Sequence, residues 1–303
     1  MRIKFFLCSY AHSPLCSYTH SLSFRSSNQR QSGMTTTSNE PTDLTIPDVQ
    51  SKPDGRRVAI DKVGVKEIEH PVSISTMKGG QQETVAGINM YVSLPADRKG
   101  THMSRFLEAL NKYQQDLQPD RIIQFCGDLR ENLDAADAHL EMSFPYFIEK
   151  KAPATGLPGL MNYQCSFQCE VNETGHDFIM SVSAAATSLC PCSKEISAYG
   201  AHNQRCLITA EVRFKGVVWI EELVEHIESA ASCPVFSVLK RPDEKLVTER
   251  AFDNPKFVED IVRDLAVRLG NDERLVWFHV KSENFESIHN HNAYAEITRD
   301  KRA

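Results

Sequence analysis

The feature that most restricts the fold is an order of hydrophobic periodicities that occurs twice along the chain. In each half, two segments of alternating apolar and polar residues come first, two segments with helical spacing follow, and two more alternating segments end the half. The first half predicts strands and helices over 65–76, 88–94, 103–117, 122–133, 139–148 and 161–171. The second half predicts them over 177–186, 206–214, 218–230, 255–269, 274–282 and 292–298.

Two ββααββ halves predict an α+β protein whose sheets are antiparallel and carry their helices on one face. We expect residues 56–173 to form a first module and residues 174–303 to form a second, which contains most of the candidate site. The last predicted helix has Asn254 as its N-cap, and Gly270 ends it. Residues 1–55 are expected to form a disordered N-terminal extension, since their composition is polar and no core periodicity continues into them.

The charge balance excludes some classes of partner. The chain has 303 residues, with 34 Lys and Arg against 40 Asp and Glu, so its formal net charge is -6. A general nucleic-acid binder would usually show an excess of basic residues, so nucleic acid is not an expected partner. No window approaches the ~18 uninterrupted apolar residues of a membrane span, so we expect no contact with a membrane.

The N-terminal composition and the cysteines bear on the compartment. Residues 1–33 contain basic side chains and no acid, which is typical of a transit peptide, but Met34 offers a second start and we favour a mis-assigned start codon. The nine cysteines come without an export signal. They therefore predict reduced thiols in a cytoplasmic protein, most of them packed in the core.

Reactive side chains crowd into the segment that follows the strand at 177–186. Cys190 and Cys192 flank a proline, Lys194 lies four residues past the first thiol, and His202 and Arg205 follow. A nearby cation can favour a thiolate, although two small buried residues at a turn would be the structural alternative. Because no second cysteine pair follows, a closed four-cysteine zinc site is not expected. A single cysteine joined by distant His and carboxylate ligands would suit an open catalytic metal site.

Four further segments carry weaker signals. The segment 283–292 holds two carboxylates and two imidazoles, and in extended chain His289 and His291 would point the same way toward one metal. The charged segment 239–245 is, taken alone, an ordinary solvated loop. Glu259, near the start of a predicted helix, either complements the helix dipole or is a partly buried acid that grips a ligand. The segment 99–105 opens a helix and is either a simple cap or an anion site.

Taken together, these segments resemble the type IB GTP cyclohydrolase family. The resemblance runs from about residue 58 to residue 298 and rests on the strings KGTHMSRF, SLCPCSKEIS-x-YGAHNQR, LKRPDEK, NPKFVED and SENFESIHNH. It implies two tandem tunnelling-fold modules in a homo-oligomer, expected to be a tetramer, with active sites at subunit interfaces. It also implies conversion of GTP and water to 7,8-dihydroneopterin triphosphate and formate, the first step of tetrahydrofolate and pterin biosynthesis.

The same resemblance implies roles for individual residues. Cys190, Glu244 and His289 would bind a divalent metal, zinc or manganese, that activates the water attacking guanine C8. His202 would shuttle protons and, with Cys190, form the catalytic group, while Glu259 would accept hydrogen bonds from guanine. The expected triphosphate ligands are the basic residues Lys99, Arg105, Lys194, Arg205 and Lys240.

Three alternatives stay open at this point. One is a nitrile reductase of the same superfamily, which acts on a deazapurine with NADPH and uses Cys190 as a covalent nucleophile. The second is a metal-buffering or purine-binding module without catalysis. The third is a close variant of the cyclohydrolase that stops at a cyclic phosphate product.

Overall fold

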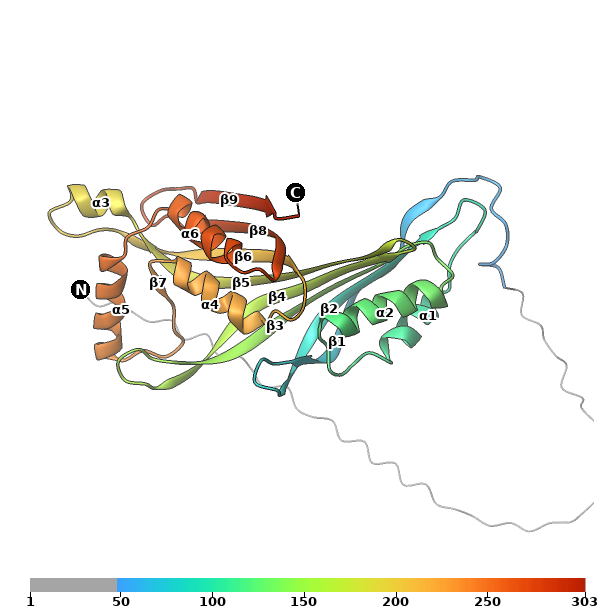
Figure 1. The fold of residues 1–303 in the computed structure, drawn as a ribbon, viewed down its shortest axis with the longest axis horizontal. Helices are drawn as coiled ribbons and strands as arrows, with labels where there is room; N and C mark the ends of the chain where they lie inside the picture. Colours follow the sequence, from blue (N-terminus) through green and yellow to red (C-terminus); the bar gives the residue numbers. More distant parts are fainter. Residues whose placement is uncertain (1–47, 303) are drawn as a thin grey trace, which may run out of the picture. The chain divides into compact units, whose positions relative to one another are not determined.

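One antiparallel sheet organises residues 48–302, the part of the chain that this computed structural model describes. Eight strands pair in the order β1-β2-β3-β4-β5-β6-β8-β9, and the short β7 pairs with β5 (Figure 1). The strands are β1 Ile60–Ser75, β2 Gln81–Leu94, β3 Ala138–Lys151, β4 Pro158–Asn172, β5 Gly175–Leu189, β6 Asn203–Phe214, β7 Cys233–Pro234, β8 Leu275–Asn284 and β9 Ala293–Asp300.

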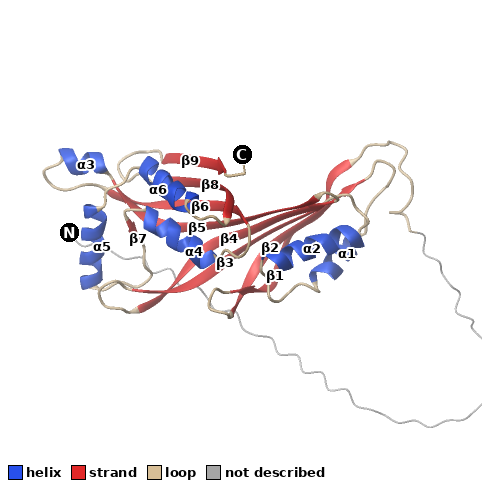
Figure 2. Cartoon of the chain, viewed as in Figure 1, coloured by secondary structure: helices blue, strands red, loops and turns tan. Residues whose placement is uncertain are grey.

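Six helices accompany these strands within the described residues. They are α1 Met103–Leu110, α2 Pro119–Asn132, α3 Pro191–Ile196, α4 Ile220–Ala230, α5 Arg241–Asp253 and α6 Val258–Gly270. Helix α2 packs on β3 and β4, whereas α4 packs on β5 and β6 and α6 on β8 and β9 (Figure 2). The first half therefore reads ββααββ, and the second half has the same order with α3, β7 and α5 added.

The apolar face of the sheet forms the core beneath these helices. One row of partnered residues crosses six strands, and each of its side chains is at most 2% exposed: Ile88, Met142, Phe167, Met180, Val212 and Phe278. Removing such side chains from water stabilises the fold by roughly 25 cal/mol per Å² of apolar surface. The predicted combination of antiparallel strands with helices on one face is confirmed.

The sheet continues across the boundary predicted between residues 173 and 174. Strands β4 and β5 are joined by a tight turn and pair along Gln164–Asn172. In that turn the Asn172 side-chain oxygen accepts the N–H groups of Thr174 and Gly175 at 2.9 and 3.1 Å. The two predicted modules thus share one sheet, and their separation as modules stays a prediction.

The helix predicted over 103–117 ends earlier, at Leu110. The residues after it bond to the edge strand β1 instead: Ser73 N–H donates to Gln114 O at 3.0 Å, and Leu117 N–H donates to Ser73 O at 2.9 Å. Leu117 is buried all the same. The apolar periodicity over 111–117 reflected the burial of the apolar side chains in this segment. The conformation of the segment is set by hydrogen bonds to the free backbone groups of the edge strand β1.

The helix predicted to begin after Asn254 begins at Val258. Asn254 does not cap it, because its side-chain amide donates to Ala231 O and Ser232 O at 3.0 and 3.1 Å. Asp260 takes the capping role and accepts the Phe257 N–H at 2.9 Å. The end of this helix at Gly270 is as predicted.

The segment predicted to be disordered up to residue 55 is partly structured. Residues 50, 52 and 54 exchange backbone hydrogen bonds with the segment that precedes α1, over Asp97–Gly100. The Asp48 carboxylate also lies 3.2 Å from His102 Nε2. The structure therefore assigns residues 48–55 to the loop before α1, while residues 1–47 lie outside the described residues.

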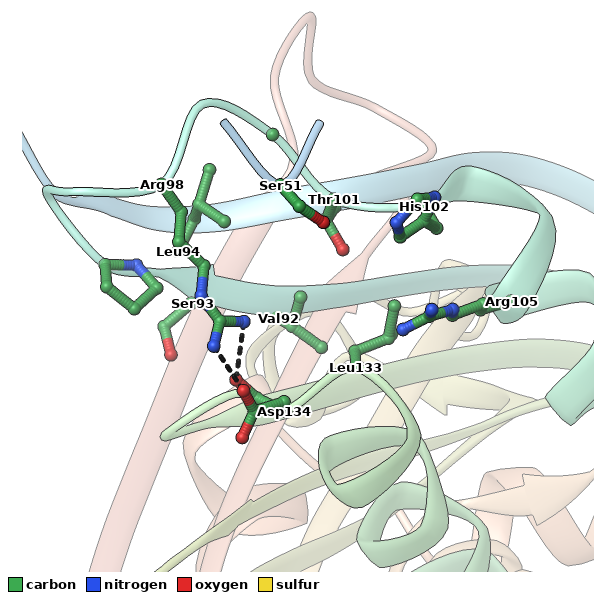
Figure 3. Close-up of a pocket in the computed structure, with 12 residues that line it drawn as sticks. Ser51, Val92, Ser93, Leu94, Arg98, Thr101, His102, Arg105, Leu133 and Asp134 are labelled. Carbon is green, nitrogen blue, oxygen red and sulfur yellow. Dashed lines mark hydrogen bonds and ion pairs between the residues drawn. The ribbon is translucent and has the colours of Figure 1, made fainter. Parts of the chain in front are cut away.

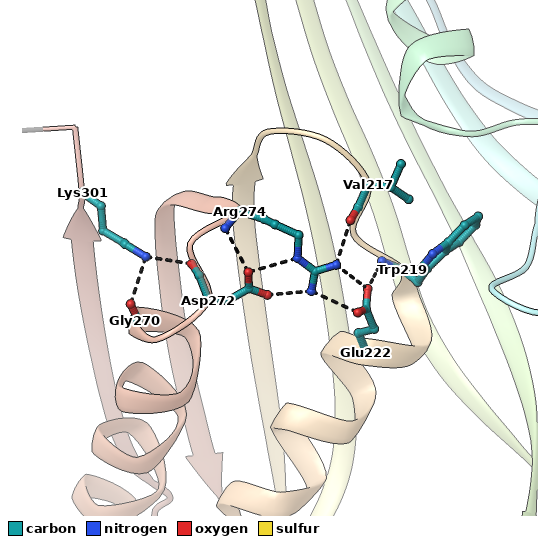
Figure 4. A network of polar contacts seen from close by, with 7 residues as sticks. All are labelled: Val217, Trp219, Glu222, Gly270, Asp272, Arg274 and Lys301. Atoms are coloured by element: carbon teal, nitrogen blue, oxygen red, sulfur yellow. Dashed lines mark hydrogen bonds and ion pairs between the residues drawn. The ribbon is translucent and has the colours of Figure 1, made fainter.

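Arg274 links the start of α4 to the end of α6 (Figure 4). Its guanidinium contacts the carboxylates of Asp272 and Glu222 at 2.7 and 3.0 Å and donates to Val217 O at 2.9 Å. Asp272 follows α6 and Glu222 lies in the first turn of α4. The bidentate geometry favours a fixed spacing between these helix ends. No helix within residues 48–302 is long and apolar enough to cross a membrane.

A buried ion pair connects the β3–β4 hairpin to α4. Lys150 Nζ donates to Glu228 Oε2 at 2.6 Å, and Tyr163 O–H donates to Glu228 Oε1 at 2.8 Å. The side chains of Lys150 and Glu228 are only 17% and 11% exposed. Burial lowers the pKa of Lys150, although the Glu228 carboxylate acts in the opposite direction. Each charge therefore depends on the other for its compensation.

Replacing Glu228 by Ala should lower the free energy of unfolding by roughly 3–5 kcal/mol, because the buried Lys150 ammonium would lose its partner. Urea denaturation measures this change. The control is Glu249→Ala, which breaks the exposed Lys245–Glu249 pair at 2.7 Å. That change should cost less than about 0.5 kcal/mol. Equal losses in the two variants would contradict the structural role of the buried pair.

Candidate functional site

The candidate site is built where β5 ends and α3 begins. Cys190 directly follows β5 and occupies the N-cap position of α3. Its thiolate or thiol sulfur accepts the Ser193 N–H at 3.4 Å, and the Ser193 hydroxyl donates to Cys190 O at 3.2 Å. Cys190 is half-buried, whereas Cys192 is exposed. The turn thus orients one of the two thiols and leaves the other in solvent.

His202 lies beside Cys190 because the chain returns to β6 at this point. Cys190 N–H donates to His202 O at 3.1 Å, and His202 N–H donates to the Ser193 hydroxyl at 3.2 Å. The two catalytic candidates predicted from the sequence are therefore neighbours in the structure. Arg205 and Lys194 lie at the same end of the sheet, in β6 and α3.

The loop after β8 also reaches this end of the sheet. Asn284 donates to the Ser188 hydroxyl at 2.9 Å, and Phe285 N–H donates to Arg205 O at 3.0 Å. Within that loop the rings of His289 and His291 stack, with centroids 5.1 Å apart and an interplanar angle of 19°. The two imidazoles thus lie side by side on an exposed loop that starts beside Ser188 and Arg205.

The start of α6 is attached to the same strand end. Lys256 N–H donates to Leu189 O at 3.0 Å, and the Ser188 hydroxyl donates to Lys256 O at 2.9 Å. Glu259 lies in the first turn of α6. Its side chain is exposed, so of the two alternatives for Glu259 the partly buried acid is not seen in a single chain.

The segment 239–245 is not a solvated loop but the beginning of α5. Asp243 is fully buried and accepts the N–H groups of Ala154 and Thr155, each at 2.8 Å, and that of Lys240 at 2.9 Å. Burial acts to raise its pKa, but these hydrogen bonds outweigh burial and lower the pKa to about 2. Asp243 thereby fixes the helix turn that carries Glu244 against the β3–β4 turn.

Glu244 lies in the first turn of α5. Helix α5 contacts α3 at its far end, where Lys194 Nζ donates to Phe252 O at 2.5 Å. Glu244 precedes Phe252 by eight residues, which is roughly 12 Å along a helix. Within residues 48–302, no group of three or more His, Cys, Asp or Glu side chains is arranged to hold a metal ion. One chain therefore does not assemble Cys190, Glu244 and His289 around a cation.

Lys99 and Arg105 lie at the opposite end of the sheet, where Arg105 lines a cavity of about 320 Å³ (Figure 3). Arg98, which lines this cavity, forms an ion pair with Asp134, and Arg105 donates to Asn132 O at 3.3 Å. The register aligns the end of β2 with His176 at the start of β5. Cys190 follows the other end of β5, roughly 46 Å away along the strand at 3.3 Å per residue. Lys99 and Arg105 are therefore too distant to reach Cys190 of the same chain.

Comparison with known proteins decides the family. Residues 46–295 match the family model described as type I GTP cyclohydrolase FolE2. The chain belongs to this family. Among its relatives is the GTP cyclohydrolase FolE2 of Geobacter sulfurreducens, 54% identical over 257 residues, or 85% of this chain and 99% of that one. That of Magnetococcus marinus is 54% identical over 254 residues, or 84% and 96% of the two chains.

Solved structures with a similar arrangement include a uricase from Bacillus fastidious. Its TM-score is 0.47 at 8% sequence identity, and the match covers 80% of this chain and 94% of that chain. The assignment to the FolE2 family rests on the sequence match alone.

Two buried polar residues at the β5–α3 end of the sheet, Asp243 and Gln204, had no predicted role. Asp243 lies between two predicted functional residues, but α5 buries only Asp243 and Ala251 and so has no apolar stripe that would reveal a helix. Gln204 lies inside one of the matched strings and is buried, at 8% exposed. A buried amide in a strand gives no sequence signal of its contacts.

The pH dependence of unfolding should report on Asp243. Because its folded pKa is lowered to about 2 from the usual 3.8, the carboxylate stabilises the fold above pH 4, and this contribution disappears as the pH falls toward 2. Wild-type protein should therefore be more stable than Asp243→Asn at pH 5, and the difference should shrink between pH 4 and pH 2. Urea denaturation across this range measures it, and a difference independent of pH would contradict the assignment.

Proposed function

We propose that this chain converts GTP and water to 7,8-dihydroneopterin triphosphate and formate at the β5–α3 end of its sheet. Membership of the FolE2 family makes it a GTP cyclohydrolase of folate and pterin biosynthesis. The observation that supports the location of the site is the convergence of Cys190, His202, the loop of His289 and the start of α6 on one strand end. The family match favours this function over a nitrile reductase and over a module without catalysis.

A divalent metal, zinc or manganese, is part of this proposal, with Cys190, Glu244 and His289 as its ligands. Their donor atoms suit it chemically, because a thiolate, an imidazole and a carboxylate together form an open catalytic site. In the described part of the chain, the Glu244 carboxylate and the His289 ring nitrogens have no hydrogen-bond or ion-pair partner that would compete. When bound, such a metal lowers the pKa of its water from ~15.7 toward ~7.

Since one chain does not gather the three ligands, we assign the completed site to an interface between copies. The strands β1 and β9 form the two edges of the sheet in residues 48–302, and near Ser73 and Ser75 the edge of β1 is already bonded to residues 114–117. An unpaired edge presents free N–H and C=O groups that another strand can meet. We propose a homo-oligomer, a tetramer, that uses these edges. Each chain would have the type IB cyclohydrolase architecture of tandem tunnelling-fold modules, and the protein would act in the cytoplasm.

His202 is the proposed proton shuttle. The unperturbed pKa of an imidazole lies near neutrality, so the ring can accept a proton and return it as the guanine five-membered ring opens. Its backbone is fixed to Cys190 and to Ser193 by hydrogen bonds at 3.1 and 3.2 Å. These contacts keep the ring at the strand end where the reacting carbon would lie.

The substrate is held by groups from two ends of the sheet in this proposal. Glu259 accepts hydrogen bonds from guanine N1–H and the 2-amino group, while Lys194, Arg205 and Lys240 lie on α3, β6 and the start of α5 at the same end. Lys99 and Arg105 would come from a neighbouring copy, because they lie at the far end of their own sheet. An interface would also cover Glu259, which is exposed in one chain.

The test of this function is a metal-free preparation supplied with GTP and one divalent ion at a time. Zinc or manganese should restore release of formate and the fluorescence of oxidised neopterin. Cys190→Ala should abolish both, because the metal would lose its thiolate. The matched control is Cys192→Ala, which removes an exposed thiol two residues away and should retain activity within about threefold.

Two results would contradict the proposal. One is the absence of formate and neopterin with every ion, although the protein is folded. The other is full turnover by Cys190→Ala. Alkylation of Cys190 that proceeds equally with and without metal would favour the covalent nucleophile of a nitrile reductase, whereas protection by metal supports the ligand role.

Glu259 gives a separate prediction about specificity. Glu259→Ala should lower kcat/KM for GTP by roughly 10²- to 10⁴-fold, because a guanine donor pair would lose its acceptor. The control Glu273→Ala removes an exposed acid on the loop after α6 and should leave kcat/KM unchanged. Steady-state kinetics of both variants measures the effect, and an equal response would exclude Glu259 from substrate recognition.

A further inference from the structure

A chain of three polar side chains ends on the imidazole of His202. Gln204 Oε1 lies 2.9 Å from His202 Nδ1, and Gln204 Nε2 donates to Glu286 Oε1 at 3.2 Å. Gln204 is 8% exposed and belongs to β6, where it pairs with Ser188 of β5. The amide is therefore held on a regular strand. Its partner residue in β5, Ser188, lies two residues before Cys190.

The chemistry of these groups fixes the direction of each hydrogen bond. An ionised carboxylate can only accept, so the NH₂ group of Gln204 must face Glu286. The carbonyl oxygen of the same amide then faces His202, and this oxygen can also only accept. Nδ1 of His202 must therefore carry a proton, which leaves the lone pair of the neutral ring on Nε2. The Ser287 hydroxyl, 3.4 Å from Nδ1, can accept a share of the same proton.

We infer that Gln204 and Glu286 are positioning residues that hold His202 in the tautomer with Nδ1 protonated and Nε2 free to take a proton. This inference deepens the proposed function and rests on it for its catalytic meaning. The protein uses the negative charge of Glu286, two groups away, to present a basic nitrogen at the strand end. An imidazole without this constraint mixes both tautomers, and only one of them presents Nε2 as a base.

The tautomer can be measured without turnover by ¹⁵N NMR of histidine-labelled protein at mildly alkaline pH. His202→Gln assigns the resonances, since it removes one ring from the spectrum. In wild-type protein His202 should show a protonated Nδ1 and an unprotonated Nε2. In Gln204→Leu the constraint is lost, and the Nε2 resonance should move toward the protonated position.

An exchange of the two side chains provides the rescue. Glu286→Gln alone leaves two amides that can both flip, so the His202 tautomer should become mixed. In the double variant Gln204→Glu with Glu286→Gln, a carboxylate faces His202 and an amide NH₂ group faces that carboxylate. The Nδ1–H tautomer should return. The control Thr209→Val removes a different buried polar contact of β6, the 2.7 Å bond to Ser183, and should leave the His202 resonances unchanged.

Kinetics then separates positioning from a merely structural role. Gln204→Leu should lower kcat for GTP roughly 10- to 100-fold, as loss of a residue that orients a catalytic His typically does, while KM stays within about twofold. The double variant should recover most of this loss. Thermal unfolding of each variant confirms that it is folded. If Gln204→Leu does not fold, the kcat and the His202 tautomer of Glu286→Gln test the inference instead.

Several outcomes would overturn the inference. These are a wild-type His202 protonated on Nε2, a tautomer that Glu286→Gln and Gln204→Leu do not alter, or an altered tautomer with unchanged kcat. Failure of the proposed function looks different, because the wild-type protein would then show the Nδ1–H tautomer without any turnover of GTP.

Discussion

The structure depends on the burial of one face of a continuous antiparallel sheet. Alternate residues of every long strand point to this face, and helices from both halves cover it, so strand register and helix position are determined together. A shift of β5 by one residue would expose Met180 and Val182 and would also turn the strand end that carries Cys190. The strand register that buries the apolar core thus also sets the position of Cys190 at the end of β5.

Local polar contacts convert this frame into a site. Packing on the apolar face places α4, α6, β6 and β8 near the end of β5. Hydrogen bonds then fix the exact positions of the segments that carry the site residues. Ser188 connects β5 to both β8 and the start of α6, and Ser193 connects Cys190 to His202. Such bonds to buried or half-buried groups are costly to leave unmade, so they fix single conformations where hydrophobic contacts would allow several.

The sequence allowed most strands and core helices to be predicted, because their burial leaves a clear period. It failed where tertiary contacts replaced local ones. Asn254 has the preferences of an N-cap, yet its amide satisfies carbonyl groups of a distant segment. Helix α5 has almost no buried side chains and therefore no period, and it is stabilised by Asp243 bonding to the β3–β4 turn. Neither contact is encoded within a short window of sequence.

In the candidate site, too, some features could be predicted from the sequence and others depend on tertiary structure. Cys190, His202 and the loop of His289 could be grouped from the matched strings, and the strand order of the structure brings their segments to one sheet end. Glu244, Lys99 and Arg105 could be named from the matched strings, but their distance from Cys190 depends on helix length and strand register. In a single chain Glu244 lies roughly 12 Å along α5 from Phe252, where that helix contacts α3, and Lys99 and Arg105 lie at the opposite end of the sheet. Since strand length cannot change without breaking the core, Lys99 and Arg105 stay far from Cys190 of the same chain.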